Sequence, residues 1–192
     1  MIPNFLNDLD LDVALSVYTP NVSQYILQSN KSEHVVDLVG SGISCFVTPT
    51  CGLVEDLEGK YFEVIDQKRK DYALIQIDHG IINTISRCDC AIADKDDFCF
   101  VEFKANAVSL DPKQVNRNYR KAMRQLHNTI DVFCNSLFAI GKDLFAQRAV
   151  EAHICFRHGY PRNTASEMTY RTQFADNNHQ CQLFFNRQKV LK

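Results

Sequence analysis

Proline and glycine are scarce in this chain: its 192 residues include only 5 prolines and 7 glycines. This excludes the turn-rich, low-complexity composition of a disordered or repetitive chain. Hydrophobic residues make up 45% and charged residues 23%, a balance typical of a folded globule. Because domains of 100 to 150 residues are common, we expect one domain over residues 1–192.

The chain also lacks an excess of positive charge and a long apolar run. Its formal net charge is −2 and its pI about 6.3, so contact with nucleic acid would need a local basic patch. No apolar run approaches the roughly 20 residues that span a bilayer, and the acidic N-terminal segment does not resemble a signal peptide. We therefore expect a cytoplasmic protein that does not bind membranes.

Several common chemical motifs are missing. The eight cysteines have no regular spacing, which favours reduced thiols over a disulfide framework. Cys88 and Cys90 form a CxC, but no second Cys or His pair completes a zinc site. The Gly40–Gly42 segment lacks the Lys-Ser/Thr that follows a phosphate-binding loop, which disfavours nucleotide hydrolysis.

The chain begins with a predicted helical segment over about residues 1–40. Apolar residues at helical spacing from Asn4 to Gln28, broken at Pro20, predict two short helices, and a third helical turn is predicted over Glu33–Val39. Further on, the pattern indicates strands at 45–48, 72–77, 81–93, 98–104, 148–157 and 182–185, with a turn at 94–97.

One long helix is predicted between these strands. Asp111 can cap it, Pro112 suits its first turn, and apolar residues recur every three or four positions up to Gly141. The resulting order predicts an α/β fold with a mixed central sheet flanked by helices.

Two strands with a four-residue turn predict a hairpin that carries charged residues. Pairing Ala93 with Phe98 sets the register and places Asp89 opposite Glu102. Lys104 lies two residues beyond Glu102, hence on the same face. Two adjacent carboxylates repel each other, and a divalent cation turns this repulsion into binding. Such a cation activates water, and a nearby lysine can orient that water or stabilise the transition state.

The stretches Cys88–Ile92 and Phe100–Lys104 resemble the catalytic hairpin of the PD-(D/E)XK nuclease superfamily, over about twenty residues. The resemblance implies a restriction-endonuclease-like core of order α-β-β-β-α-β. It also implies that Asp89 and Glu102 bind Mg²⁺ or Mn²⁺ and that Lys104 assists catalysis. Cys88 replaces the usual proline.

Two further roles are implied by this resemblance. Gln125, on the predicted long helix, resembles a glutamine that many members place near the active site. An upstream acid often completes the metal shell; Glu33 is the first candidate, with Glu55, Glu63 and Asp78 as alternatives.

The long helix carries basic residues without acidic ones between Pro112 and Ile130. Arg117, Lys121 and Arg124 fall near one stripe with Gln125, so we expect them to contact a phosphate backbone, although a solvated helix face would have the same composition.

The sequence therefore predicts a metal-dependent nuclease that acts on DNA in preference to RNA. The resemblance makes a role in bacterial defence or DNA repair plausible. Because no sequence-reading module is visible, targeting would come from a homodimer or from a partner protein. The alternatives are a catalytically inactive nuclease fold that binds nucleic acid or assembles a complex, and a protein-interaction module with solvated charged faces.

Overall fold

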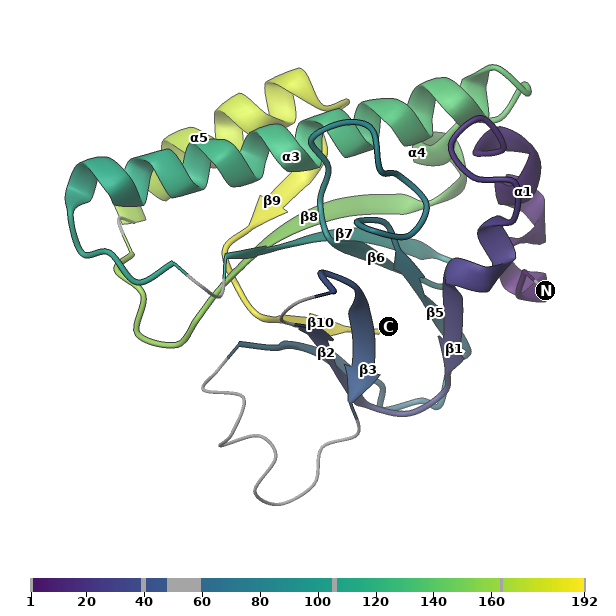
Figure 1. The fold of residues 1–192 in the computed structure, drawn as a ribbon, viewed down its shortest axis with the longest axis horizontal. Helices are drawn as coiled ribbons and strands as arrows, with labels where there is room; N and C mark the ends of the chain where they lie inside the picture. The colour runs from purple at the N-terminus through teal and green to yellow at the C-terminus, as the bar shows by residue number, and fades with distance from the viewer. Residues whose placement is uncertain (1, 39–40, 48–59, 105–106, 163, 192) are drawn as a thin grey trace.

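The computed structural model describes residues 2–38, 41–47, 60–104, 107–162 and 164–191. In these ranges the chain forms a six-stranded sheet and a four-stranded sheet, with helices on one face of the larger sheet (Figure 1). The prediction of an α/β fold with a mixed sheet is confirmed. None of the helices in these ranges is long and apolar enough to cross a membrane.

The larger sheet has the strand order β1-β5-β6-β7-β8-β9. Its strands are β1 (Ile26–Ser29), β5 (Tyr72–Gln76), β6 (Cys90–Ala93), β7 (Asp97–Lys104), β8 (Ala149–Phe156) and β9 (Gln182–Phe184). Strands β1, β5, β6 and β7 pair antiparallel, whereas β7, β8 and β9 pair parallel. Along the chain, β5, β6 and β7 form a meander, and one long helix then leads to β8 beside β7.

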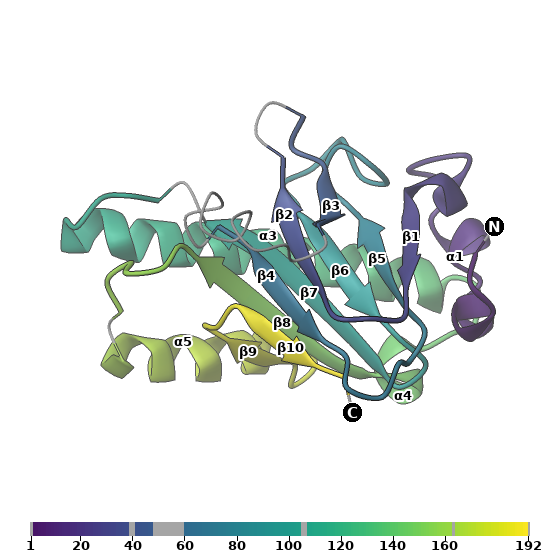
Figure 2. The same ribbon diagram turned by 90° about the horizontal axis from the view of Figure 1, so that it is seen from below.

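The smaller sheet has the strand order β10-β4-β2-β3 and lies against the other face of the larger sheet (Figure 2). Its strands are β2 (Glu33–Asp37), β3 (Ser44–Val47), β4 (Phe62–Ile65) and β10 (Gln188–Val190). Strand β10 follows β9 closely, so the C-terminal segment links the two sheets (Figure 2).

Helices α3 and α5 cover the face of the larger sheet that points away from the smaller one (Figure 1). The helices are η1 (Asn4–Leu9), α1 (Leu11–Ala14), η2 (Val22–Tyr25), α3 (Pro112–Phe138), α4 (Leu144–Gln147) and α5 (Thr164–Asn177). Helix α3 begins as predicted, because the Asp111 side chain accepts a hydrogen bond from the Lys113 N–H. It ends near Gly141, whose φ of 77° suits glycine.

Side-chain alternation along the strands divides the apolar residues between two cores. On β7, Phe98 and Phe100 pack with α3 residues such as Phe133, whereas Cys99 and Val101 face the smaller sheet. Both faces of β7 are therefore buried, which explains why it is apolar at almost every position.

The β6–β7 hairpin has the predicted register. Ala93 pairs with Phe98, and the ladder continues to the pair of Cys90 with Val101. The Asp94 carboxylate closes the turn by accepting hydrogen bonds from the N–H groups of Asp96 and Asp97, both at 2.7 Å.

The predicted helical segment over residues 1–40 is wrong beyond Tyr25. Residues 33–37 form strand β2 instead of a helical turn, because Val35 and Val36 are buried within the smaller sheet. The predicted strand over 81–93 is confirmed only from Cys90, since residues 79–81 form a turn and Ile82 makes an isolated bridge with Asp78. Helix α5 was not predicted, because its sequence has no clear apolar stripe.

Candidate active site

Three of the predicted residues meet at the ends of β6 and β7. Glu102 and Lys104 lie on β7, and Asp89 immediately precedes β6. The regular ladder stops one pair before Asp89, whose N–H donates to the Val101 carbonyl at 3.2 Å. Asp89 and Glu102 are therefore neighbours without forming the predicted regular pair.

Glu102 is the most deeply buried charged residue of this group, with 1% exposure. One carboxylate oxygen, Oε1, accepts a hydrogen bond from Lys104 Nζ, while Oε2 is buried and has no partner. Burial, reinforced by the negative charge of Asp89, raises the pKa of Glu102 well above its usual range despite the positive charge of Lys104. The fold thus buries a carboxyl group with one oxygen that has no hydrogen-bond partner among the described residues.

Asp89 shares this electrostatic environment. Burial raises its pKa to about 7, although a hydrogen bond from the Phe103 N–H at 2.5 Å opposes the shift. The same hydrogen bond fixes the direction of the carboxylate, because its donor belongs to the backbone of β7. Asp89 and Glu102 are consequently held together by the hairpin in spite of their like charges.

Lys104 is held between β7 and α3. Its Nζ donates to Glu102 and, at 2.8 Å, to Oε1 of Gln125. The side chain of Lys104 is 13% exposed, so its ammonium can still be approached from solvent. The structure therefore brings Gln125 to Lys104, where the resemblance placed it.

The segment before Asp89 is tied to α3 by contacts that sequence reasoning missed. The Gln125 amide donates to the Arg87 carbonyl at 2.8 Å, and Thr129 Oγ1 accepts from the Cys88 N–H at 2.8 Å. Arg87 in turn pairs with Asp78, with Nε and Oδ1 2.6 Å apart. These contacts fix the position at which the chain enters β6. Those with α3 join segments about 40 residues apart, so no local sequence motif predicts them.

Glu33 does not reach this site. It lies at the start of β2, where Lys31 pairs with it, and its strand ends at Asp37 four residues later, about 13 Å further along. The prediction assumed that Glu33 lay on a helix, and the strand carries it away. Glu63 lies on β4 beside His34, 4.0 Å from the imidazole nitrogen, and Glu55 is outside the described residues.

Asp78 and Asp37 are the acids that the fold brings near the pair. Both contribute to the raised pKa of Asp89 through their negative charge. Asp37 was not predicted; burial, and then the charge of Asp78, raises its own pKa, and its Oδ1 is buried without a partner. Its only sequence signal is an acid at the end of an apolar strand.

Gly42, shortly before β3, packs against this region. Gly42 has a φ of 66°, and a Cβ added there would lie 2.5 Å from the His79 ring. Glycine is therefore required both by backbone conformation and by the contact with the residue that follows Asp78.

A cleft of about 470 Å³ opens beside the pair. Asp37, Lys60, Lys104 and Lys121 line it together with residues of the segment that leads into α3. Lys104 therefore borders a cleft that also has two other lysines and one aspartate in its lining, whereas Asp89 and Glu102 do not line it.

An open groove of about 540 Å³ runs along the exposed face of α3. Its basic lining residues are Lys113, Arg117, Arg120, Lys121 and Arg124. In the part of the chain that the structure describes, none of these pairs with an acid, and Lys121 also lines the cleft beside Lys104. The predicted basic stripe therefore leads toward the candidate site.

Another group of potential metal ligands lies between the two sheets. Cys99, Glu151 and His153 offer ligand atoms within 4.8 Å of one another. The Lys189 ammonium, 2.5 Å from Glu151 Oε1, already neutralises the carboxylate. Hydrogen bonds from His153 and Lys189 outweigh the effect of burial and lower the pKa of Glu151 to about 2. This group is best interpreted as a buried ion pair that joins the sheets.

Comparison of the chain with protein-family models, with curated proteins and with solved structures found no match.

Proposed function

We propose that this protein is a metal-dependent nuclease with a PD-(D/E)XK centre formed by Asp89, Glu102 and Lys104. The observation that carries the proposal is the pair of buried, mutually repelling carboxylates beside a lysine that a helix residue, Gln125, holds in place. The strand order β5, β6, β7, then α3 and β8, agrees with the restriction-endonuclease-like core that this assignment requires.

The residues present fit a divalent cation. Glu102 Oε2 and Asp37 Oδ1 are buried oxygens without partners, and hard cations such as Mg²⁺ prefer oxygen ligands. Asp89 and Glu102 do not form, with any third described His, Cys, Asp or Glu, a group whose ligand atoms all lie within 4.8 Å. A cation bound here would therefore have these two carboxylates and would take its remaining ligands from water, as Mg²⁺ often does.

Asp89 and Glu102 would hold the cation, with Asp37 or Asp78 able to complete its shell through water. When bound, the cation supplies an activated water and neutralises charge on the phosphodiester. Lys104 would stabilise the negative charge that develops on the phosphate oxygens, and Gln125, which accepts a hydrogen bond from the ammonium, would hold it in place. Hydrolysis joins the water oxygen to phosphorus, breaks one phosphorus–oxygen ester bond and delivers a proton to the leaving oxygen.

DNA is the favoured substrate and RNA the alternative; the exposed cations of α3 provide a face that can bind the phosphate backbone of either. Arg117, Lys121 and Arg124 would contact the backbone. Selection of targets would then depend on a second copy of the chain or on a partner protein.

Cleavage assays test the proposal directly. Single- and double-stranded DNA and RNA are incubated with Mn²⁺ or with EDTA and the wild-type protein, Glu102→Ala or Lys104→Ala. Lys95→Ala, at the exposed turn on the far end of the same hairpin, is the matched control.

We expect metal-dependent cleavage by the wild type and the control, and none by the other variants. Cleavage that survives Glu102→Ala would refute the assigned centre. No cleavage together with no Mn²⁺-induced rise in melting temperature would favour an inactive nuclease fold.

A further inference from the structure

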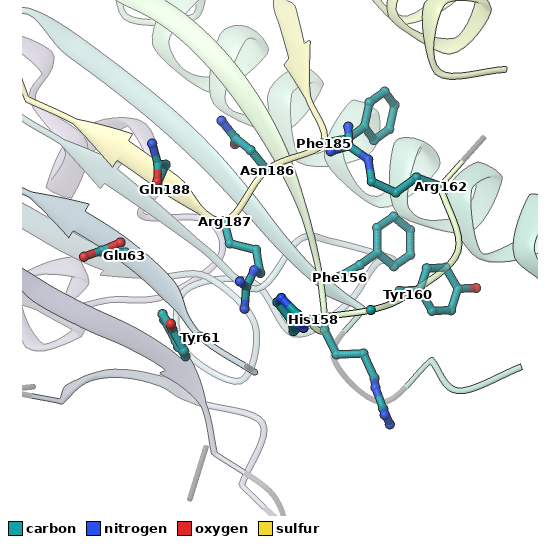
Figure 3. A pocket seen from close by; sticks show the side chains of 12 residues that line it. Tyr61, Glu63, Phe156, His158, Tyr160, Arg162, Phe185, Asn186, Arg187 and Gln188 are labelled. Atoms are coloured by element: carbon teal, nitrogen blue, oxygen red, sulfur yellow. The ribbon is translucent and has the colours of Figure 1, made fainter. Parts of the chain in front are cut away.

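A second hollow, of about 560 Å³, lies at the end of β8 and combines aromatic and basic side chains (Figure 3). Its aromatic lining residues are Tyr61, Phe156, Tyr160 and Phe185, and its basic ones are Arg157, His158, Arg162 and Arg187. Among the residues that the structure describes, Glu63 is its one acidic lining residue. The hollow is therefore positive, although the whole chain is slightly negative.

Arg187 is presented as a flat cation in this hollow. Its guanidinium lies over the Tyr61 ring, 5.3 Å from the centroid, and Tyr61 stacks in turn on His34 with 4.3 Å between centroids. In Figure 3, the Arg187 side chain lies between Tyr61 on one side and His158 on the other, with Phe156 and Tyr160 further away. A guanidinium held in this way offers a plane on which an unpaired nucleobase can stack.

The other basic residues of the hollow differ in the partners they have within the protein. Arg162 is committed to Glu167, with Nη2 and Oε2 2.6 Å apart. Arg157 makes no hydrogen bond or ion pair with any residue that the structure describes, and His158 next to it is exposed. Arg157 and His158 are thus the groups that can meet a phosphate at the rim.

The hollow adjoins the candidate active site through the fold. Lys104 on β7 pairs with Phe156 on β8, so the lining begins one strand, about 4.8 Å, from the catalytic lysine. Lys60 lines the cleft beside Lys104, and the next residue, Tyr61, lines the hollow. The cleft and the hollow therefore lie next to each other, on either side of Lys60 and Tyr61 and across the pairing of β7 with β8.

We infer that this hollow binds an unpaired nucleotide of a nucleic-acid strand that continues from the active site, with its base stacked on Arg187 and its phosphate beside Arg157. The inference rests on the proposed nuclease function and narrows its substrate to nucleic acid that is single-stranded next to the cleaved bond. In a duplex, the base faces are covered by their neighbours and cannot stack on the guanidinium.

Binding is measured in EDTA, where a metal-dependent enzyme cannot cut, by the fluorescence anisotropy of labelled oligothymidine and of a labelled duplex. Arg187→Ala and Arg187→Lys are compared with wild type, and Lys95→Ala is the control. Melting temperatures verify that each variant is folded.

Stacking on a protein side chain contributes about 1 to 3 kcal/mol per base, so both Arg187 variants should weaken binding of the single strand by roughly 5- to 150-fold and leave duplex binding unchanged. Arg157→Ala should reduce the slope of log K against log salt by about 0.7 on the single strand.

Other results would overturn the inference. Wild-type affinity in Arg187→Ala would show that the hollow does not bind the strand. Wild-type affinity in Arg187→Lys would show that the positive charge at position 187 is sufficient, which excludes stacking on the guanidinium. Competition by free AMP at the concentration of the oligonucleotide's own nucleotides would identify a mononucleotide site instead. If the wild type cleaves with metal but Arg187→Ala binds normally, the inference about the hollow is refuted and the proposed nuclease function stands. If binding depends on Arg187 but no cleavage occurs, the nuclease function is refuted and nucleotide binding in the hollow stands.

Discussion

Replacing Glu102 with Gln is expected to stabilise the metal-free protein and to remove its response to Mn²⁺. Glu102 is 1% exposed, its Oε2 has no partner and the like charge of Asp89 is close. Glutamine keeps an oxygen that can accept from Lys104 and removes the negative charge that burial and Asp89 both disfavour. Because burying a carboxylate costs more than burying an amide, we expect the free energy of unfolding to rise by about 1 to 3 kcal/mol.

The stabilisation by Mn²⁺, in contrast, should be smaller in Glu102→Gln than in the wild type. For the wild type, Mn²⁺ at about 100 times its Kd adds about 2.7 kcal/mol of stability. In a chain of this size each kcal/mol corresponds to about 2 to 4 °C, so the melting temperature should rise by roughly 5 to 11 °C. Glu102→Gln should lose most of this rise, because an amide oxygen is a weaker ligand for a hard cation than a carboxylate.

Thermal unfolding with EDTA and with Mn²⁺ measures both effects. Glu63→Gln is the matched control, since Glu63 undergoes the same substitution outside the candidate active site with a side chain that is 40% exposed. A Glu102→Gln protein that is less stable than wild type in EDTA would show that Glu102 and Lys104 form a stabilising structural pair. An undiminished response to Mn²⁺ would refute the metal assignment.

Further predictions concern the lysine, the basic helix, the buried ion pair and Gly42. Lys104→Met should reduce single-turnover cleavage by about 10²-fold or more while preserving the Mn²⁺-induced rise in melting temperature; loss of both would indicate a structural role. Arg117→Ala combined with Lys121→Ala should make the slope of log K against log salt on duplex DNA shallower by about 1.8, as two lost phosphate contacts require, and an unchanged slope would exclude this face. The Glu151 carboxyl, whose pKa falls from 4.5 to about 2, contributes about 3 kcal/mol of stability above pH 4.5, and this contribution is lost as pH falls toward 2. Urea unfolding across this range should therefore show a steeper loss for wild type than for Glu151→Gln. Gly42→Ala should lower the free energy of unfolding by about 1 kcal/mol or more, because its φ is 66° and the new Cβ would meet His79; wild-type stability would contradict this account.

The sequence determined the central hairpin and the long helix. The four-residue turn that Asp94 closes specifies the register of β6 and β7, and a slip by one residue would turn Glu102 and Lys104 to the other face of the sheet. Asp111 and the apolar stripe specify α3 in the same local way. Glu102 and Lys104 could therefore be placed on one face of the hairpin from sequence alone, whereas a position of Gln125 near them was implied only by the family resemblance.

Only the tertiary structure decided the remaining surroundings of the site. Whether residues 33–37 form a helix or a strand depends on the partner strands of the smaller sheet, and this choice removes Glu33 and brings Asp37 near Asp89. The hollow around Arg187 likewise combines β4, the end of β8 and the β9–β10 connection. Such arrangements depend on contacts between segments far apart in the chain, and no local spacing of residues encodes them.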